Sequence, residues 1–353
     1  LSLHDALPIF SQRSYIEDVL KRFGFERANG VKTPIKPEDT MKHIEMPEKG
    51  TSQHFEENDG CEFEVRQAVG ALYHLARWTM PEILFAVNHC AQFQTLSKKQ
   101  TWKRVENIMK YVANNKDCYQ EFGNKETPMV MFVDSGYGGT ARENALKAAA
   151  KRRGRVLSAD KIEKMSELEM KRVLNSILEE QTKSSNGIDF HKEDLKSQYG
   201  YVCMFFGGPG SCSSKKDPAL SQSSTEAEIK ALNESIREAL HLIKLLNEFG
   251  MSPNYQVQQE NDPMIILEDN AGAKSTANSE KTTQRNKHLA IKQFWCADQV
   301  ENGHVRVMTV TTHENVADIF TKPFAAPQFE KLALWLRGKA WPPSYETGEG
   351  SFD

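Results

Sequence analysis

The longest regular spacing of apolar and polar residues in the chain begins at Ser223 and ends near Gly250. Apolar or small residues recur there every three or four positions, at Leu232, Ile236, Ala239, Leu240, Ile243 and Leu246. This spacing predicts an amphipathic helix whose apolar face packs against the rest of the protein. One turn before Leu232, the same face carries Glu228.

Two glutamates in the first turns of this helix are predicted to have different roles. Glu226 lies three residues after Ser223, which is the spacing of a capping box, and it is aligned with Lys230 on the polar, solvent-facing side. Glu228 points inward, and a buried carboxylate needs a hydrogen-bonding partner, a cation or a metal ion.

The pattern before residue 121 is helical. A short helix runs from Tyr15 to Phe23 and stops at Gly24, and a Glu/Lys/Pro-rich linker follows over 37–62. Three further helices are predicted by apolar faces: one containing Val69, Leu72, Tyr73 and Ala76, one started by Pro81, and one over about 98–113. The Tyr and Trp residues of this block have the spacing of core residues, so we expect them to be buried.

After residue 121 the pattern changes to short apolar runs. They predict strands over 129–133, 199–206, 211–215, 264–267 and 305–310, with a turn over 207–210. Helices are expected at 224–250, around 291–300, and last at 316–320. Residues 141–197 are charged and have the character of an insertion. The order of elements predicts an α/β layer built on a mixed sheet.

Four carboxylates are expected at one edge of this sheet. Asp134 ends the first strand, and Asp269 follows the fourth in the run Glu268 to Asn270. Glu228 and Asp318 would reach the same edge from helices. Converging carboxylates repel one another unless cations neutralise them, and oxygen ligands of this kind suit Mg²⁺ or Mn²⁺. The alternative for each aspartate is an ordinary turn or cap residue.

Composition narrows the class of protein. The chain has 353 residues and a formal net charge of -3, which argues against coating nucleic acid by bulk charge but leaves room for a local basic patch. Its six cysteines form no CxxC pair, so we expect an intracellular protein without a zinc site or disulfide framework. The sequence does not resolve whether the protein lies in a cytoplasmic particle or in the nucleus. No apolar run approaches a membrane span, so no membrane partner is expected. Residues 1–9 have the character of a fragment edge, and the sequence predicts no element of the fold there.

Several short motifs occur together and in order. They are Phe132–Gly139, Tyr199–Val202 with Gly207–Gly208, Ser213–Pro218, Ser223–Glu228, Asp269–Asn270, Lys287–Leu289 and Ala317–Pro323. In this set the chain resembles the ribonuclease H domain of copia-type retrotransposon Pol polyproteins. Upstream, Arg66–Tyr73, Pro81–Ile83, Trp102 and Lys110–Val112 resemble the segment that follows the reverse transcriptase, and Gln12–Tyr15 with Thr33–Pro34 resemble the end of the polymerase.

The resemblance implies a domain organisation. Residues 1–36 would be a remnant of the reverse transcriptase, 37–62 a linker, 63–121 a small helical connector, 122–340 a ribonuclease H-like domain with the insertion 141–197, and 341–353 a flexible tail. The implied fold is a ribonuclease H-like mixed five-stranded sheet flanked by helices.

The resemblance also implies an activity, which is hydrolysis of the RNA strand of RNA–DNA hybrids by two Mg²⁺ ions, with Mn²⁺ as a possible substitute. The four carboxylates of the family fall on Asp134, Glu228, Asp269 and Asp318. The implied partners are the hybrid and the upstream reverse transcriptase domain. Hybrid shape and 2′-OH contacts would give selectivity.

The chain departs from the family at three points. Gly136 replaces a second acidic residue, the insertion 141–197 separates the first two strands, and the aspartate pair of the polymerase is absent, so this chain cannot synthesise DNA by itself. Two alternatives therefore stay open: a catalytically silent or decayed nucleic-acid-binding module, and a nuclease that is active only when joined to its polymerase.

Five further residues are weaker substrate-binding candidates. Ser214 and Lys215 would hold phosphates, or simply form a solvated strand end. Asn270 would donate to the sugar edge of the hybrid, or cap the following helix. His288 and His313 would contact substrate or assist product release, or pack and face solvent.

A dense basic run lies within the insertion, at Lys147, Lys151, Arg152, Arg153 and Arg155. It would follow the phosphates of a nucleic acid, as clustered Lys and Arg side chains do. The alternative is a flexible, solvated insertion without a role in binding.

Overall fold

A computed structural model of the chain describes residues 8–40, 44, 51–52, 64–123, 129–138, 196–253, 263–270, 272, 274–275 and 289–342. Its centre is a sheet of five strands: β3 (Val130–Gly136), β4 (Gln198–Phe205), β5 (Gly208–Lys216), β6 (Met264–Glu268) and β7 (Val305–Thr309). The spatial order is β5-β4-β3-β6-β7. Strands β5, β4 and β3 pair antiparallel, whereas β3, β6 and β7 pair parallel. This arrangement confirms the ribonuclease H-like mixed sheet.

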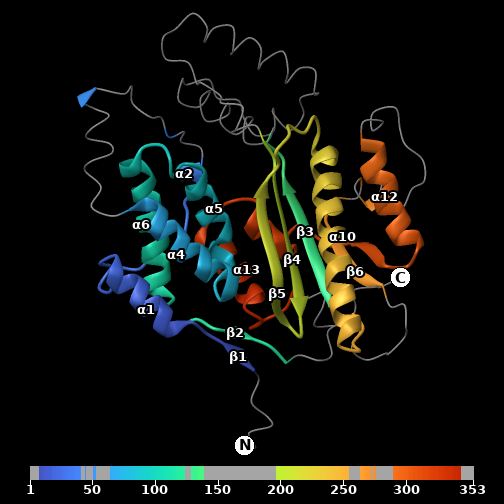
Figure 1. Ribbon diagram of the computed structural model, residues 1–353, viewed down its shortest axis with the longest axis horizontal. Helices are drawn as coiled ribbons and strands as arrows, with labels where there is room; N and C mark the ends of the chain where they lie inside the picture. The colour runs from blue at the N-terminus through green and yellow to red at the C-terminus, as the bar shows by residue number, and fades with distance from the viewer. Residues whose placement is uncertain are drawn as a thin grey trace, which may run out of the picture.

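Helices cover both faces of the sheet (Figure 1). One face carries the helix α10 (Ser224–Glu248), with α12 (Ala290–Glu301) packed beside it. The other face is covered by the 3₁₀ helix η5 (Val316–Phe320), by α13 (Ala326–Leu336) and by the N-terminal helices. Alternation along β3 divides the core between the two faces, because Val130 and Phe132 pack with the second set and Met131 and Val133 pack with α10.

The N-terminal helices are α1 (Arg13–Arg22), α2 (Pro37–Thr40), α4 (Val65–Trp78), α5 (Leu84–Gln92) and α6 (Lys98–Asn114), with the 3₁₀ helix η2 (Pro81–Ile83) before α5. They close the free edge of β5. Arg77 donates to the Cys212 carbonyl at 2.8 Å, and Asn88 donates to the Ser214 carbonyl at 2.6 Å. These side chains occupy backbone acceptors that an edge strand would otherwise expose.

A buried ion pair also joins the N-terminal helices to the end of α13. The Arg337 guanidinium pairs with the Glu82 carboxylate, to which the Tyr111 hydroxyl donates at 3.3 Å. One hydrophobic core therefore extends from α1 to α13. The predicted boundary between residues 121 and 122 stays a prediction.

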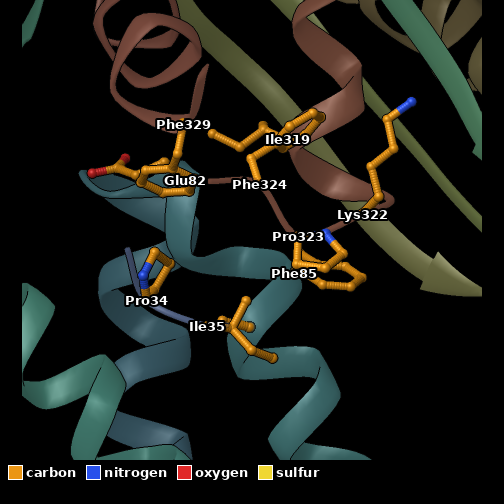
Figure 2. Close-up of a pocket in the computed structure, with 10 residues that line it drawn as sticks. Pro34, Ile35, Glu82, Phe85, Ile319, Lys322, Pro323, Phe324 and Phe329 are labelled. Carbon is orange, nitrogen blue, oxygen red and sulfur yellow. The ribbon is translucent and has the colours of Figure 1, made fainter. Parts of the chain in front are cut away.

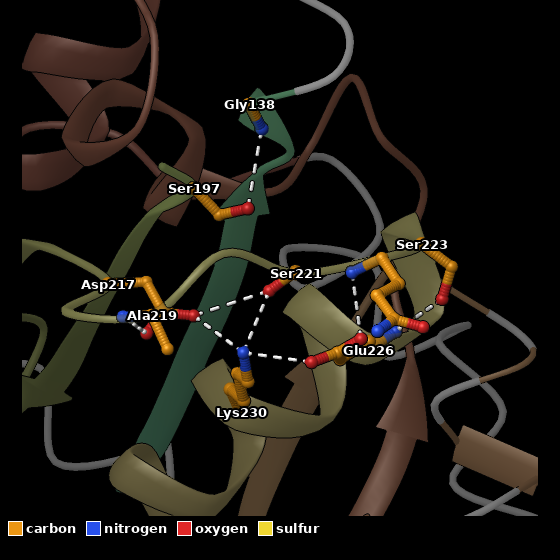
Figure 3. A network of polar contacts seen from close by, with 9 residues as sticks. Gly138, Ser197, Asp217, Ala219, Ser221, Ser223, Glu226 and Lys230 are labelled. Atoms are coloured by element: carbon orange, nitrogen blue, oxygen red, sulfur yellow. Dashed lines mark hydrogen bonds and ion pairs between the residues drawn. The ribbon is translucent and has the colours of Figure 1, made fainter. Parts of the chain in front are cut away.

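The insertion leaves the pairing of the first two strands intact. The register of β3 and β4 is continuous from Val130 opposite Met204 to Gly136 opposite Gln198. Beyond the strands, the Gly138 N–H donates to the Ser197 hydroxyl at 3.3 Å (Figure 3). Residues 139–195, including the basic run, lie outside the described residues.

Several details of the secondary structure differ from the prediction. Strand β3 continues through Asp134 to Gly136, because β4 pairs with it over that length. The hairpin turn is Phe206–Gly207, with φ of 47° and 85°, instead of 207–210. Positive φ at both turn residues matches the twist of the flanking strands. Pro209 then lies in β5, where an edge strand tolerates it.

Other predictions were wrong near the ends of the chain and on helix surfaces. Residues 316–320 form a 3₁₀ helix, and α13 follows it, so 316–320 is not the last helix. Ile9–Phe10, of which Ile9 was excluded as a fragment edge, pairs as β1 with β2 (Gln120–Glu121). Tyr73 and Trp78 are 42% and 57% exposed, because no part of the described chain covers them.

Candidate metal centre

Asp134 is fixed at the edge of the sheet by contacts with the segment around η5. The Thr321 hydroxyl donates to its carboxylate, and the Asn315 side chain donates to the Val133 carbonyl at 2.8 Å. Asn315 also accepts from the Ala317 N–H at 3.1 Å, so one side chain caps η5 and ties it to β3. Asp134 is buried.

The glycine at position 136 has a steric role here. A Cβ at Gly136 would lie 2.9 Å from the Thr321 carbonyl oxygen. A larger residue, such as the acidic one that the resemblance leads us to expect, would push Thr321 away from the sheet. The departure from the family pattern thus accompanies a close approach of the segment that orients Asp134.

Asp318 lies in η5 and faces Asp134 across the sheet edge. Burial, and next the charge of Asp134, raise the pKa of Asp318 to about 8, although the Lys322 ammonium lies 2.7 Å from its carboxylate and opposes the shift. The backbone of this segment rests on the N-terminal helices. Ile319, Lys322, Pro323 and Phe324 line a small pocket together with Pro34, Ile35 and Phe85, and Figure 2 shows the Lys322 side chain extending away from it.

Glu228 points toward the sheet from the second turn of α10, as its position on the apolar face predicts. Its pKa is raised well above the usual value by burial, then by the charges of Glu268 and Asp134. Among the described residues, its Oε2 atom has no hydrogen-bond partner. The charge of Lys322 opposes the shift, but it is the smallest of these effects.

Glu226 has a different environment from the predicted one. The Ser223 hydroxyl accepts from the Glu226 N–H at 3.1 Å, which confirms the cap, and the Glu226 carboxylate accepts from the Gln222 N–H at 2.8 Å. However, Glu226 and Lys230 are buried, so the prediction of a solvent-facing side was wrong for both. The segment 217–222 contacts this turn of α10 and covers it.

Lys230 is the centre of the resulting polar network (Figure 3). Its ammonium lies 3.0 Å from both the Glu226 and the Asp217 carboxylates and 3.1 Å from the Ser221 hydroxyl. Asp217 also accepts from the Ala219 N–H at 2.9 Å. These contacts hold the first turns of α10, from which Glu228 projects.

Asp269 and Glu268 end β6 together. Asp269 is half-buried, and burial followed by the charge of Asp134 raises its pKa. Glu268 is 0% exposed and packs on the α10 side, where Met264 and Ile266 of the same strand also point. Sequence reasoning missed Glu268 as a site residue. The alternation of positions 264, 266 and 268 along the strand was the signal that would have found it.

The carboxylates form two groups in which the ligand atoms all lie within 4.8 Å of one another. The first group is Asp134, Asp269 and Asp318, and the second is Glu228, Glu268 and Asp269. The structure thus brings the four predicted carboxylates to one edge of the sheet, with Asp269 common to both groups. Their role as metal ligands stays a prediction.

The weaker candidates lie in ordinary surroundings. The buried Ser214 hydroxyl donates to the Phe320 carbonyl at 2.6 Å, so it joins β5 to η5. The Asn270 side chain accepts from the Gly272 N–H at 2.9 Å, as a capping residue does. Lys215 and His313 are exposed, and His288 lies outside the described residues.

The sheet order and the acidic edge define a ribonuclease H-like α/β protein with a candidate centre for divalent cations. No family model matches the chain. It is 27% identical over 336 residues to the retrovirus-related Pol polyprotein from transposon RE1 of Arabidopsis thaliana, covering 95% of this chain and 18% of that protein. It is 24% identical to the corresponding polyprotein from transposon TNT 1-94 of Nicotiana tabacum, covering 91% and 19%.

A shorter part of the chain is similar to a yeast protein. The transposon Ty1-DR5 Gag-Pol polyprotein of Saccharomyces cerevisiae is 29% identical over 145 residues, covering 40% of this chain and 8% of that protein. The chain is therefore related to the Pol polyproteins of transposons, and it spans about a fifth of the length of the plant relatives.

Among solved structures, the crystal structure of prototype foamy virus protease-reverse transcriptase matches with a TM-score of 0.23 and 11% identity, covering 89% of this chain and 50% of that chain. A score this low supports no argument. In the described part of the chain, no helix has the length and apolar character needed to cross a membrane.

Proposed function

We propose that this chain hydrolyses the RNA strand of RNA–DNA hybrids, as the ribonuclease H region of a retrotransposon Pol polyprotein. The observation that carries the proposal is the convergence of Asp134, Glu228, Asp269 and Asp318 at one edge of a ribonuclease H-like sheet. The relationship to transposon Pol polyproteins supports it.

The residues at this edge fit divalent metal ions. Glu228 and Glu268 each have a buried carboxylate oxygen without a partner among the described residues, and such charges are costly unless a cation compensates them. Carboxylate oxygens are the ligands that Mg²⁺ and Mn²⁺ take in proteins. Asp134, Asp269 and Asp318 would hold one ion, and Glu228 with Asp269 a second. When bound, two such ions activate a water molecule and stabilise the leaving oxygen in phosphoryl transfer.

The protein itself contributes orientation and charge. Thr321 holds the Asp134 carboxylate, and Asn315 holds η5 against β3, so Asp134 and Asp318 are kept at a fixed separation. The Lys322 side chain is 40% exposed, and its ammonium beside Asp318 would attract a backbone phosphate to this edge. Selectivity for a hybrid would come from its shape and its 2′-OH groups.

The test is cleavage of a labelled RNA–DNA hybrid in Mg²⁺ by the full chain, by Asp134→Asn and by the matched control Asp298→Asn, whose side chain is exposed on α12. We expect cleavage by the first and third proteins. Asp134→Asn should be slower by more than about a hundredfold, because losing even a residue that only orients a metal ligand costs about ten- to a hundredfold.

Other outcomes would select the alternatives. Hybrid binding without cleavage by the folded chain would overturn the enzymatic proposal and favour a silent binding module. Cleavage that appears only after fusion to a polymerase domain would show that the activity depends on the polyprotein. Circular dichroism of each variant establishes that it is folded.

A further inference from the structure

The two carboxylate groups at the sheet edge differ in how their charge is balanced. In the group of Asp134, Asp269 and Asp318, the Lys322 ammonium pairs with Asp318 and the Thr321 hydroxyl donates to Asp134. In the group of Glu228, Glu268 and Asp269, neither glutamate forms an ion pair with another described residue. The second group therefore carries three carboxylates and forms no ion pair with a lysine or arginine of the described part of the chain, although the charge of Lys322 acts on Glu228 and Asp269 from beyond ion-pair distance.

Glu268 is the most constrained member of that group. Its backbone pairs with Val133 on β3 and with Thr309 on β7, and its carbonyl accepts from the Val310 N–H at 3.1 Å. The backbone of Glu268 is therefore held on both sides, and its side chain is buried. One carboxylate oxygen, Oε1, accepts from the Asn270 N–H at 3.1 Å, and Oε2 has no donor among the residues that the structure describes.

We propose that Glu268 is a fifth carboxylate ligand at this edge, holding a divalent cation together with Glu228 and Asp269. The inference deepens the proposed function and rests on it. Glu268 lies outside the four carboxylates that the family resemblance implies. Its ligand atom lies within 4.8 Å of those of Glu228 and Asp269, and its free oxygen is buried in the same group. A divalent ion there would reduce the charge of the group from three negative charges to one.

The rigid position of Glu268 gives the inference a physical basis. A ligand whose backbone is fixed loses little conformational entropy when it binds, so it contributes more to affinity than a mobile side chain does. The bond from the Asn270 N–H fixes one oxygen and leaves the other to face the group. We therefore expect Glu268 to determine how tightly the cation on the α10 side is held.

The experiment measures Mn²⁺ binding to the full chain without substrate, by the electron paramagnetic resonance signal of free Mn²⁺. It compares the unmodified chain, Glu268→Gln and the control Glu248→Gln, an exposed position on α10. We expect Glu268→Gln to lower the affinity for one of two Mn²⁺ ions by about tenfold or more and to leave the affinity for the other ion unchanged. Asp318→Asn should instead lower the affinity for that other ion.

The melting temperature gives a second readout, measured once without divalent ions and once with saturating Mn²⁺. Without divalent ions, Glu268→Gln should raise the melting temperature, because it removes a buried carboxylate from a group whose like charges repel one another. Saturating Mn²⁺ should raise the melting temperature of the variant by less than it raises that of the unmodified chain, because the variant binds the ion more weakly. Should Glu268→Gln fail to fold, Glu268→Asp keeps the charge, withdraws the oxygens by one methylene, and should weaken the same ion.

The outcomes separate this inference from the proposed function. Unchanged Mn²⁺ affinities and an unchanged Mn²⁺-induced shift in Glu268→Gln would overturn the role of Glu268, even if the chain cleaves hybrids. Loss of one ion in the variant, with no hybrid cleavage by the unmodified chain, would support the ligand and overturn the nuclease.

Discussion

Two glutamates of α10, only two residues apart, are equally buried and yet lie in opposite electrostatic surroundings. Glu226 is 5% exposed and Glu228 is 7% exposed. The Glu226 carboxylate lies 3.0 Å from the Lys230 ammonium and accepts from the Gln222 N–H. Glu228 lies beside Glu268 and Asp269 instead. Burial of a carboxylate therefore does not indicate a metal site by itself, and the balance of charge around it is the informative property.

The magnitudes explain why this difference matters. Two like charges about 4 Å apart interact by roughly 4 kcal/mol at an effective dielectric constant of about 20. In the Lys230 network, one cation lies between two carboxylates, so attraction offsets repulsion. In the group of Glu228, Glu268 and Asp269, no described residue forms such an ion pair, and the charge of Lys322 offsets the repulsion only in part. A site that is unfavourable when empty and favourable with a cation is the expected design for metal binding.

The largest expected effect is a difference in hybrid cleavage between variants of Glu228 and of Glu226. Glu228→Gln should lower kcat/KM for hybrid cleavage by more than about a hundredfold, because it removes a proposed metal ligand. Glu226→Gln removes a charge of similar burial but should leave kcat within about threefold, and it should lower stability instead. Cleavage kinetics and urea denaturation of both variants provide the comparison. Equal losses of activity would contradict the distinction.

The next effect is a loss of stability when the ion pairs of Lys230 with Asp217 and Glu226 are removed. Lys230→Met keeps the length of the side chain but leaves Asp217 and Glu226 buried without a cation, so we expect a loss of about 3–5 kcal/mol in the free energy of unfolding. Lys244→Met, at an exposed position on the same helix, is the matched control and should change stability by less than about 0.5 kcal/mol. A loss below about 1 kcal/mol for Lys230→Met would show that the network is not essential to α10.

Much of the fold could be predicted because the strands have distinct apolar runs. Strand β6 and helix α10 lie within two residues of their predicted positions. The prediction failed where pairing partners decide the outcome. Strand β3 extends past its apolar run because β4 pairs with it as far as Gly136, and Ile9–Phe10 is a strand only because Gln120–Glu121 lies beside it.

The candidate site could be predicted where a single helix or strand determines which way a side chain points. The helical spacing of α10 predicted that Glu228 points inward, and the structure places it there. The burial of Glu226 and Lys230 depends on the segment 217–222, which contacts them from outside the helix. Glu268 was missed because a polar residue at the end of a strand is usually solvated, whereas here α10 covers it.

The smallest of these effects is a pH dependence of stability without divalent ions. The pKa of Asp318 rises from 3.8 to about 8 in the folded protein, so between these values the folded state holds a proton that the unfolded state lacks. This contribution to stability is complete below pH 3.8, decreases as pH rises, and is lost above pH 8. In a chelator, the free energy of unfolding should therefore fall by about 1.4 kcal/mol per pH unit for this proton well below pH 8, and by roughly 2 kcal/mol in total from pH 6 to 8. The raised pKa values of Glu228, Glu268 and Asp269 act in the same direction.

Urea denaturation at pH 6, 7 and 8 measures this slope. Asp318→Asn should flatten it, whereas Asp298→Asn, at an exposed position, should leave it unchanged. Saturating Mg²⁺ should also flatten the slope, because a cation that binds ionised carboxylates replaces the protons in compensating their charge. If the slope persists in Asp318→Asn and in Mg²⁺, the protons belong to groups outside the acidic edge, and the contrast between the balanced and unbalanced carboxylates would not account for the pH dependence.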